Sequence, residues 1–153
     1  MNLITFRIVK YLLLMFSMLF ASPAIVRAEN WRPLVMKIKG IEASRGGQIR
    51  VFVFVKDGFP TKNDKALKTY TQPVGDGEIM IPIEAPADIP FALKVHHDED
   101  GNNKLTKNWT GIFPTEGLGF SSDAKLNFGP PSFAAAKMSM PESMRVSISM
   151  LYP

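Results

Sequence analysis

The sequence predicts an all-β protein, a β-sandwich of six to seven strands of immunoglobulin-like or transthyretin-like type with one long packed loop. Three observations predict this class. Apolar residues recur at every second position in five stretches, which is the period of a strand buried on one face. Short runs of glycine, proline, asparagine and aspartate separate these stretches. Apart from one short turn, no stretch has a helical period.

Residues 1–28 have the three parts of a secretory signal peptide. Arg7 and Lys10 give a positive start, residues 11–20 are an apolar run, and residues 26–28, Val-Arg-Ala, form a small-residue cleavage site. The apolar run is too short to cross a bilayer, which takes about 20 residues in a helix. We therefore expect cleavage at this point, export to the periplasm of a Gram-negative bacterium or secretion, and no integral membrane segment in the mature chain.

Charge and cysteine content limit the partners and the compartment. The chain has 18 Lys and Arg against 14 Asp and Glu, and losing Arg7, Lys10 and Arg27 with the signal leaves 15 against 14. This small excess predicts no nucleic-acid or anionic-membrane partner, because domains that bind phosphates electrostatically usually have a strongly basic face. The absence of cysteine means that a single domain at residues 29–153 must rely on its core, which favours a bacterial periplasm.

The first two predicted strands lie at residues 34–39 and 48–56. The second is apolar on most of both faces, which is typical of a central strand. Residues 44–47, Ser-Arg-Gly-Gly, lie between them and have the composition of a tight turn. We therefore expect these two strands to form a hairpin.

The remaining strands follow the same alternation. A weaker strand is expected at residues 67–74, and clearer ones at residues 78–84, 89–95 and 144–151. Pro82 cannot donate a ladder hydrogen bond, so its strand is expected at the edge of a sheet.

Residues 98–142 separate the last two clear strands. Structureless loops of this length are uncommon in compact domains and tend to be functional or disordered. Disorder is disfavoured because the segment is rich in aromatics, so we expect it to fold back over the sandwich, with one helical turn capped by Ser132 at residues 132–137. For the aromatic side chains we favour a small apolar core beneath the loop over a ligand groove. They are Trp109, Phe113, Phe120, Phe128 and Phe133.

The start of this segment concentrates side-chain oxygens. Asp98, Asp100 and Asn102 have the Asp-x-Asp-x-Asn spacing that opens calcium loops, and Lys104 would offer a backbone carbonyl. Hard cations such as Ca²⁺ prefer carboxylate and amide oxygens. The alternative is a solvated turn held by side-chain to backbone hydrogen bonds and neutralised by Lys104. We favour the turn and keep the Ca²⁺ site as the second interpretation.

The rest of the calcium template is absent. Asn103 stands where an EF-hand has glycine, Trp109 stands where it has a bidentate glutamate, and no helices flank the loop. A helix-loop-helix hand is therefore excluded. A looser site on a sandwich loop could be completed by Glu116 or Asp123.

Two adjacent histidines end the strand before this turn. Neighbouring strand residues point to opposite faces, so His96 and His97 cannot share one metal without a bulge. The side chain of His97 is expected to point to the same face as Val95, toward the core. This predicts a buried structural residue that forms a hydrogen bond with a loop. His96 has the register of Lys94 and is expected to be exposed.

Catalytic templates are missing from the chain. There is no Gly-x-Ser-x-Gly elbow, no His-Glu-x-x-His, no cysteine nucleophile and no glycine-rich phosphate loop. Glu116 could pair with Asp98 or Asp100 as two catalytic carboxylates. We favour a solvated loop carboxylate instead.

Three ordered blocks, residues 95–105, 108–121 and 128–133, combine a strand ending in His-Asp, a Gly-Ile-Phe-Pro-Thr-Glu-Gly-Leu-Gly-Phe-Ser segment and a Gly-Pro-Pro-Ser-Phe segment. In these blocks the chain resembles the exported bacterial proteins known as domain of unknown function 2141. The resemblance covers nearly the whole mature chain. It implies a periplasmic β-sandwich and assigns no chemistry.

These observations favour an exported periplasmic protein that acts as a non-catalytic binding or envelope-associated module. Its partner would be an unidentified ligand or an envelope protein. Two alternatives remain open, a calcium-assisted hydrolase or lyase acting on an envelope metabolite and a structural accessory subunit. The candidate functional residues lie at or after the end of the fifth strand. They are His97, Asp98, Trp109, Glu116, Phe120 and Phe133.

Overall fold

The structure, a computed structural model, describes residues 30–153, so the predicted signal peptide at residues 1–28 lies outside the described residues. The described part contains seven strands. They are β1 (Trp31–Ile41), β2 (Gln48–Phe54), β3 (Lys68–Pro73), β4 (Gly77–Pro86), β5 (Ala92–Asp98), β6 (Leu118–Phe120) and β7 (Arg145–Ser149). The short helices are η1 (Ala43–Arg45), η2 (Asn63–Lys65), η3 (Ser121–Asp123) and α2 (Phe133–Ala136).

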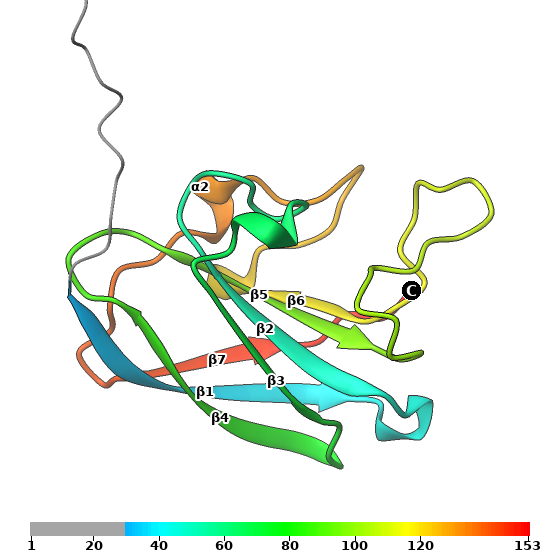
Figure 1. Ribbon diagram of the computed structural model, residues 1–153, viewed down its shortest axis with the longest axis horizontal. Coiled ribbons are helices and arrows are strands. Elements are labelled where there is room, and N and C mark those ends of the chain that lie inside the picture. Colours follow the sequence, from blue (N-terminus) through cyan, green and yellow to red (C-terminus); the bar gives the residue numbers. More distant parts are fainter. Residues whose placement is uncertain (1–29) are drawn as a thin grey trace, which may run out of the picture.

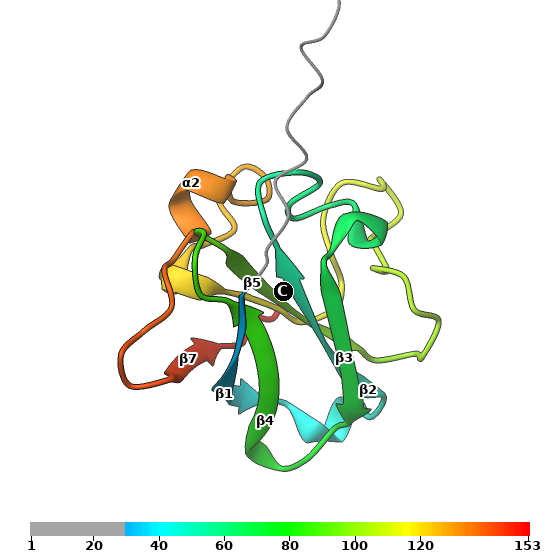
Figure 2. The same cartoon turned by 60° about the vertical axis from the view of Figure 1, so that its left-hand side comes forward.

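The strands form two sheets packed face to face (Figures 1 and 2). One sheet has the order β4-β1-β7, with β1 and β7 parallel, and the other has the order β3-β2-β5-β6, with all neighbours antiparallel. The predicted all-β sandwich of six to seven strands is confirmed.

The core lies between the sheets and follows the predicted alternation. Leu34, Met36 and Ile38 on β1 are at most 1% exposed, because their side chains meet the inward face of the other sheet. Fully burying an aliphatic side chain of this size contributes about 1.5–3 kcal/mol. The other fully buried aliphatic members are Ile49, Val51, Val53, Ala85, Leu93, Val95 and Ile148.

Two predictions about strand position are confirmed. β2 lies between β3 and β5, as expected for a strand that is apolar on both faces. Among the strands of residues 30–153, β4 pairs only with β1, so Pro82 lies on an edge strand, where a missing N–H donor is tolerated.

The predicted hairpin at residues 44–47 is wrong. β1 pairs with β4 and β7, whereas β2 pairs with β3 and β5, so this turn carries the chain from one sheet to the other. Gly46 and Gly47 have φ values of 70° and 76°. Such left-handed glycines serve an inter-sheet turn as well as a hairpin, and alternation alone does not specify which strands pair.

The long segment is partly ordered as strand and helix. β6 adds to β5 as an antiparallel edge strand, which the sequence analysis missed. The helical turn is confirmed, because Ser132 Oγ accepts a hydrogen bond from the backbone N–H of Ala135 at 3.2 Å and so caps α2. Among residues 30–153, none of the helices has the length and apolar character needed to cross a membrane.

Candidate functional site

Polar side chains line the outer face of the four-stranded sheet, on the side away from the core. On β5, Lys94, His96 and Asp98 point outward and are only 0–3% exposed. They are buried because residues 99–117, which we call the covering loop, and the segment around η2 lie over this face (Figure 1). The register places Arg50 of β2 directly beside His96.

Glu116 anchors the covering loop to the sheet. Its Oε2 accepts hydrogen bonds from His96 Nε2 at 2.9 Å and from the N–H of Thr106 at 2.8 Å. Its Oε1 accepts from the N–H of Glu99 at 3.0 Å. The side chain is 4% exposed, so the expected solvated carboxylate is wrong. Both oxygens close the loop, which gives this residue a structural role.

The predicted exposure of His96 is also wrong. The ring is 0% exposed and Nδ1 has no hydrogen-bond partner in the described part of the chain. Burial lowers the pKa of His96 below its usual value, against the smaller opposing effect of Glu116. The ring is therefore neutral near pH 7 and donates through Nε2. The alternation of side chains along the strand correctly predicted the face of the sheet on which His96 lies. It could not show that a loop covers this face.

His97 occupies the predicted position on the core face. It is 0% exposed, and both ring nitrogens are satisfied by Gly46 O at 2.6 Å and Tyr152 Oη at 2.8 Å. Because a carbonyl can only accept, Nε2 donates to Gly46 and Nδ1 accepts from Tyr152. His97 therefore holds the inter-sheet turn and the C-terminal segment together.

The acidic turn is built from side-chain to backbone hydrogen bonds. Asp98 Oδ2 accepts from Gln48 Nε2 at 2.7 Å and from the N–H of Asn103 at 3.0 Å. Asp100 accepts from the N–H of Asn102 at 3.0 Å. Burial raises the pKa of Asp98, but the donors from Gln48 and Asn103 outweigh it, so its pKa lies below the usual value.

The predicted calcium ligands are only partly brought together. Asp98, Asp100 and Glu116 each place an oxygen within 4.8 Å of the others. Asn102 Oδ1 instead accepts from the N–H of Lys104 at 2.6 Å. Asp98 Oδ1 is buried without a hydrogen-bond partner among the described residues. The Ca²⁺ site stays a prediction, with Glu116 as a better third ligand than Asn102.

Residues 107–114 form a small hairpin that projects from the body (Figure 1). The N–H of Asn108 bonds Phe113 O at 2.9 Å, and the N–H of Gly111 bonds Asn108 O at 2.8 Å. Trp109 is 96% exposed, Ile112 66% and Phe113 59%. We call these three residues the apolar tip.

The predicted small core beneath the loop is therefore wrong for three of its five aromatics. Trp109 and Phe113 belong to the apolar tip, and Phe128 is fully exposed on the neighbouring loop. Phe120, at 3% exposed, is buried as expected. Phe133 is half-buried. Both contact the ring of Phe59, at centroid distances of 6.1 and 6.0 Å.

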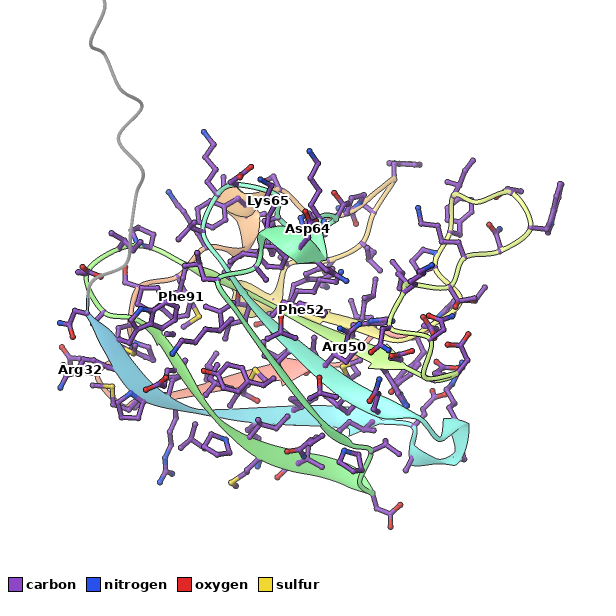
Figure 3. The ribbon with its side chains drawn as sticks, in the orientation of Figure 1. Arg32, Arg50, Phe52, Asp64, Lys65 and Phe91 are labelled. Carbon is purple, nitrogen blue, oxygen red and sulfur yellow. The ribbon has the colours of Figure 1, made fainter. Side chains whose placement is uncertain are left out.

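A cavity of about 610 Å³ lies between η2 and the covering loop, which we call the lysine cavity. Lys94 lies at its floor and donates from Nζ to Pro60 O at 3.0 Å and to Asn63 Oδ1 at 2.9 Å. Burial, with a smaller effect of Arg50, lowers the pKa of Lys94 to about 8. Figure 3 shows Arg50 along β2 with Asp64 of η2 above it.

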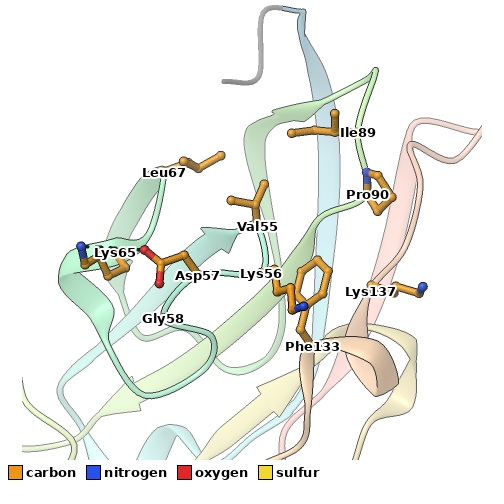
Figure 4. A pocket seen from close by; sticks show the side chains of 10 residues that line it. All are labelled: Val55, Lys56, Asp57, Gly58, Lys65, Leu67, Ile89, Pro90, Phe133 and Lys137. Carbon is orange, nitrogen blue, oxygen red and sulfur yellow. Dashed lines mark ion pairs between the residues drawn. The ribbon is translucent and has the colours of Figure 1, made fainter. Parts of the chain in front are cut away.

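A second cavity of about 850 Å³ lies beside the end of β2 (Figure 4). Its wall is apolar, and three lysines and one aspartate surround it. Asp57 is 3.8 Å from Lys65, so one of the three positive charges is paired. The lining side chains include Val55, Leu67, Ile89, Pro90 and Phe133, with Lys56, Lys65 and Lys137.

Sequence reasoning missed Lys94 and Arg50 as members of a covered polar face. A usable signal was present, because Lys94 lies in a strand whose neighbouring residues Leu93 and Val95 are apolar, and Arg50 lies between Ile49 and Val51 in a similar strand. Ile112 was also missed as an exposed residue of the tip. Nothing in its local pattern separates an exposed loop position from a buried one.

Comparison with known proteins gives one family. The chain matches a family model described as "Uncharacterized protein conserved in bacteria (DUF2141)" over residues 36–149. That range includes the covering loop, the apolar tip and both cavities. No curated protein and no solved structure matches the chain.

Proposed function

The chain belongs to this family of uncharacterized proteins conserved in bacteria, and from that premise we propose that it is an exported, non-catalytic module that docks on the lipid surface of the cell envelope. Docking occurs through the apolar tip of the 107–114 hairpin. The observation that carries the proposal is the exposure of Trp109, Ile112 and Phe113 on one projecting hairpin (Figure 1). The signal-peptide pattern of residues 1–28 supports export to the periplasm.

Exposed apolar residues of this kind indicate an interaction surface. Single exposed leucines or methionines are common on soluble proteins, but contiguous large apolar side chains usually mark a binding site. Burying each of these three side chains would contribute about 1.5–3 kcal/mol. The tip therefore provides enough apolar surface for reversible attachment.

The shape and chemistry of the tip favour a lipid surface over a protein. The hairpin is narrow and convex, so a flat protein surface would cover little of it. Several of its backbone donors are satisfied internally: Asn108 Oδ1 accepts from the N–H of Phe113 at 3.3 Å, and Thr110 Oγ1 accepts from the N–H of Ile112 at 3.4 Å. Segments that enter the membrane interface need this internal satisfaction, and tryptophan is enriched at that depth.

Attachment of this kind does not require a basic protein. The near-zero net charge of the mature chain predicts no dependence on anionic lipids, and insertion of apolar side chains needs none. We therefore expect the mature chain to bind vesicles of zwitterionic phosphatidylcholine.

Vesicle flotation of the mature chain, residues 29–153, tests the proposal. Trp109→Ser should lose flotation because it removes the largest side chain of the tip. Met80→Ser is the matched control, since Met80 is 63% exposed on β4, away from the tip, and flotation should be retained. In a Trp31→Phe background, the emission of Trp109 should shift to shorter wavelength when vesicles are added.

Two results would contradict lipid docking. One is equal flotation of Trp109→Ser and the unsubstituted protein. The other is a protein that does not bind vesicles but forms dimers, together with loss of these dimers in Trp109→Ser. The tip would then be a contact between two copies of the chain.

A second candidate function is Ca²⁺ binding at the acidic turn. It is favoured by Asp98 Oδ1, which is buried near Asp100 and Glu116 and has no hydrogen-bond partner within residues 30–153. An ion held only by the folded protein raises its melting temperature by linkage. Millimolar Ca²⁺ should therefore raise the melting temperature relative to chelator, and Asp98→Asn should remove the difference. Superimposable melting curves of the unsubstituted protein would exclude this site.

A further inference from the structure

The lysine cavity has a buried positive charge without a negative partner. Lys94 is 3% exposed, and no Asp or Glu among residues 30–153 forms an ion pair with it. Its hydrogen-bond partners, Pro60 O and Asn63 Oδ1, are neutral, and so is the Phe52 ring, whose centroid lies 5.3 Å from Nζ in a cation–π contact. An ammonium has three N–H donors, so one donor has no hydrogen-bond acceptor in the described part of the chain.

Such an arrangement is unfavourable unless something compensates it. A buried charge is normally paired, because desolvation penalises the charged form. Arg50 on the adjacent strand adds repulsion rather than relief, and the pKa of Lys94 is lowered to about 8 by burial first and by Arg50 second. The fold keeps this lysine at a cavity floor although an apolar residue would avoid the cost.

We propose that the lysine cavity binds a phosphate group, with Lys94 at its floor and Lys104 and Lys107 at its rim. The cavity volume of about 610 Å³ is within the range of small-ligand sites. Asp64 is the only acid among its lining residues, against three lysines. Asn63 accepts from Lys94 through Oδ1, which leaves its amide NH₂ as a further donor to the same anion.

The phosphate could belong to a soluble metabolite or to a lipid headgroup, and the chemistry at Lys94 is the same for both. The site does not depend on the proposed docking of the apolar tip, because a soluble anion can enter the cavity without a membrane. A protein with a disabled tip should therefore keep this site.

The charge of Lys94 gives the site a pH profile. The charged and titratable groups facing it are Arg50, His96, Asp64, Lys104 and Lys107. Burial lowers the pKa of His96, so its ring is neutral near pH 7. Affinity for phosphate should fall as the pH rises above 8, because Lys94 then releases its proton.

Titration calorimetry of the mature chain with inorganic phosphate tests the site. Lys94→Met should weaken binding by at least about tenfold, as expected for loss of a charge-assisted hydrogen bond. Lys107→Met, which leaves the floor intact, should weaken it by a smaller factor. Lys137→Met, beside the other cavity, is the matched control and should bind phosphate like the unsubstituted protein. Far-ultraviolet circular dichroism checks that each variant is folded.

A second experiment distinguishes a soluble phosphate ligand from a lipid headgroup. It measures binding of the Trp109→Ser protein, which lacks the contribution of the apolar tip, to vesicles of phosphatidylglycerol. Binding of inorganic phosphate indicates a soluble ligand, and binding only of the anionic vesicles indicates a headgroup; in both cases Lys94→Met must weaken it. Three results would overturn the proposal: no binding of either probe, a folded Lys94→Met that binds as tightly as the unsubstituted protein, or an affinity that does not fall above pH 8.

Discussion

Lys94 illustrates how a single residue can reduce stability while serving a site. Its pKa of about 8, against an ordinary value of 10.5, means that the folded protein disfavours the charged form. Such a shift corresponds to a cost of about 3 kcal/mol when the lysine is protonated in both states. The cost should therefore be visible in the stability of the unliganded protein.

We expect Lys94→Met to change the pH dependence of stability. Between about pH 8 and pH 10.5 the unfolded chain holds a proton on Lys94 that the folded protein has released, so stability rises with pH in this window. The variant lacks this rise. Urea unfolding measures this effect. From pH 7 to pH 10.5, the free energy of unfolding of the unsubstituted protein should increase by about 3 kcal/mol relative to that of Lys94→Met. A constant difference between the two proteins would contradict the assignment.

Glu116 stabilises the folded protein by accepting hydrogen bonds from three donors. Glu116→Ala would leave His96 Nε2 and the N–H groups of Glu99 and Thr106 without an acceptor. An unsatisfied buried donor costs about 1–3 kcal/mol, and of these three only that of His96 is in a fully buried hydrogen bond, so the free energy of unfolding should fall by at least about 1 kcal/mol. Glu116→Gln retains one acceptor oxygen and should fall less. Equal urea midpoints for Glu116→Ala and the unsubstituted protein would contradict this role.

At the scale of elements, the turn between the two sheets is fixed by a close backbone approach. A Cβ on Gly47 would lie 2.2 Å from the carbonyl oxygen of Asp98, whereas a Cβ on Gly46 would meet nothing within 4 Å. Both residues have left-handed φ values. An alanine at Gly46 would therefore meet only backbone strain, whereas an alanine at Gly47 would meet backbone strain and steric overlap together.

Gly46→Ala should cost about 1–2 kcal/mol, which is the penalty of a left-handed alanine. Gly47→Ala should cost clearly more, because the end of β5 or the turn has to move away from the new methyl group. Thermal denaturation of both variants measures the difference. Equal melting temperatures would show that the turn relaxes freely and would contradict the close approach.

The elements differ in how far the sequence predicts them, for physical reasons. β2, the edge position of β4 and the cap of α2 were predicted because each depends on local chemistry: two apolar faces, Pro82 and Ser132. The partner of β1 was predicted wrongly because strand pairing is decided by distant residues. β6 was missed because three residues are too few to show an alternation.

The candidate site was predicted less well than the fold. His97 was correctly predicted because strand parity fixes the face of a side chain. His96 and Glu116 were predicted to be solvated, since parity says nothing about a loop that later covers the face. The apolar tip was predicted to be buried because aromatic composition suggests a core, and only the three-dimensional course of the hairpin exposes it.

At the scale of the whole molecule, the two sheets differ on their outer faces. The covering loop and η2 lie over the sheet that contains β2 and β5, and both the lysine cavity and the apolar tip belong to this side. On the other sheet, Val35 and Met80 remain exposed at 38% and 63%. The features that carry the proposed functions are therefore gathered on one side of the sandwich, where an approaching ligand or membrane would meet them together.

The parallel pairing of β1 with β7 has a consequence for biogenesis. β1 is completed by β7, more than 100 residues later in the chain, so the three-stranded sheet cannot close until residues 145–149 are available. A chain threaded through a translocation channel from its N-terminus would stay unfolded for most of its passage. If the chain is exported as proposed above, this topology would keep the three-stranded sheet open until β7 has left the channel.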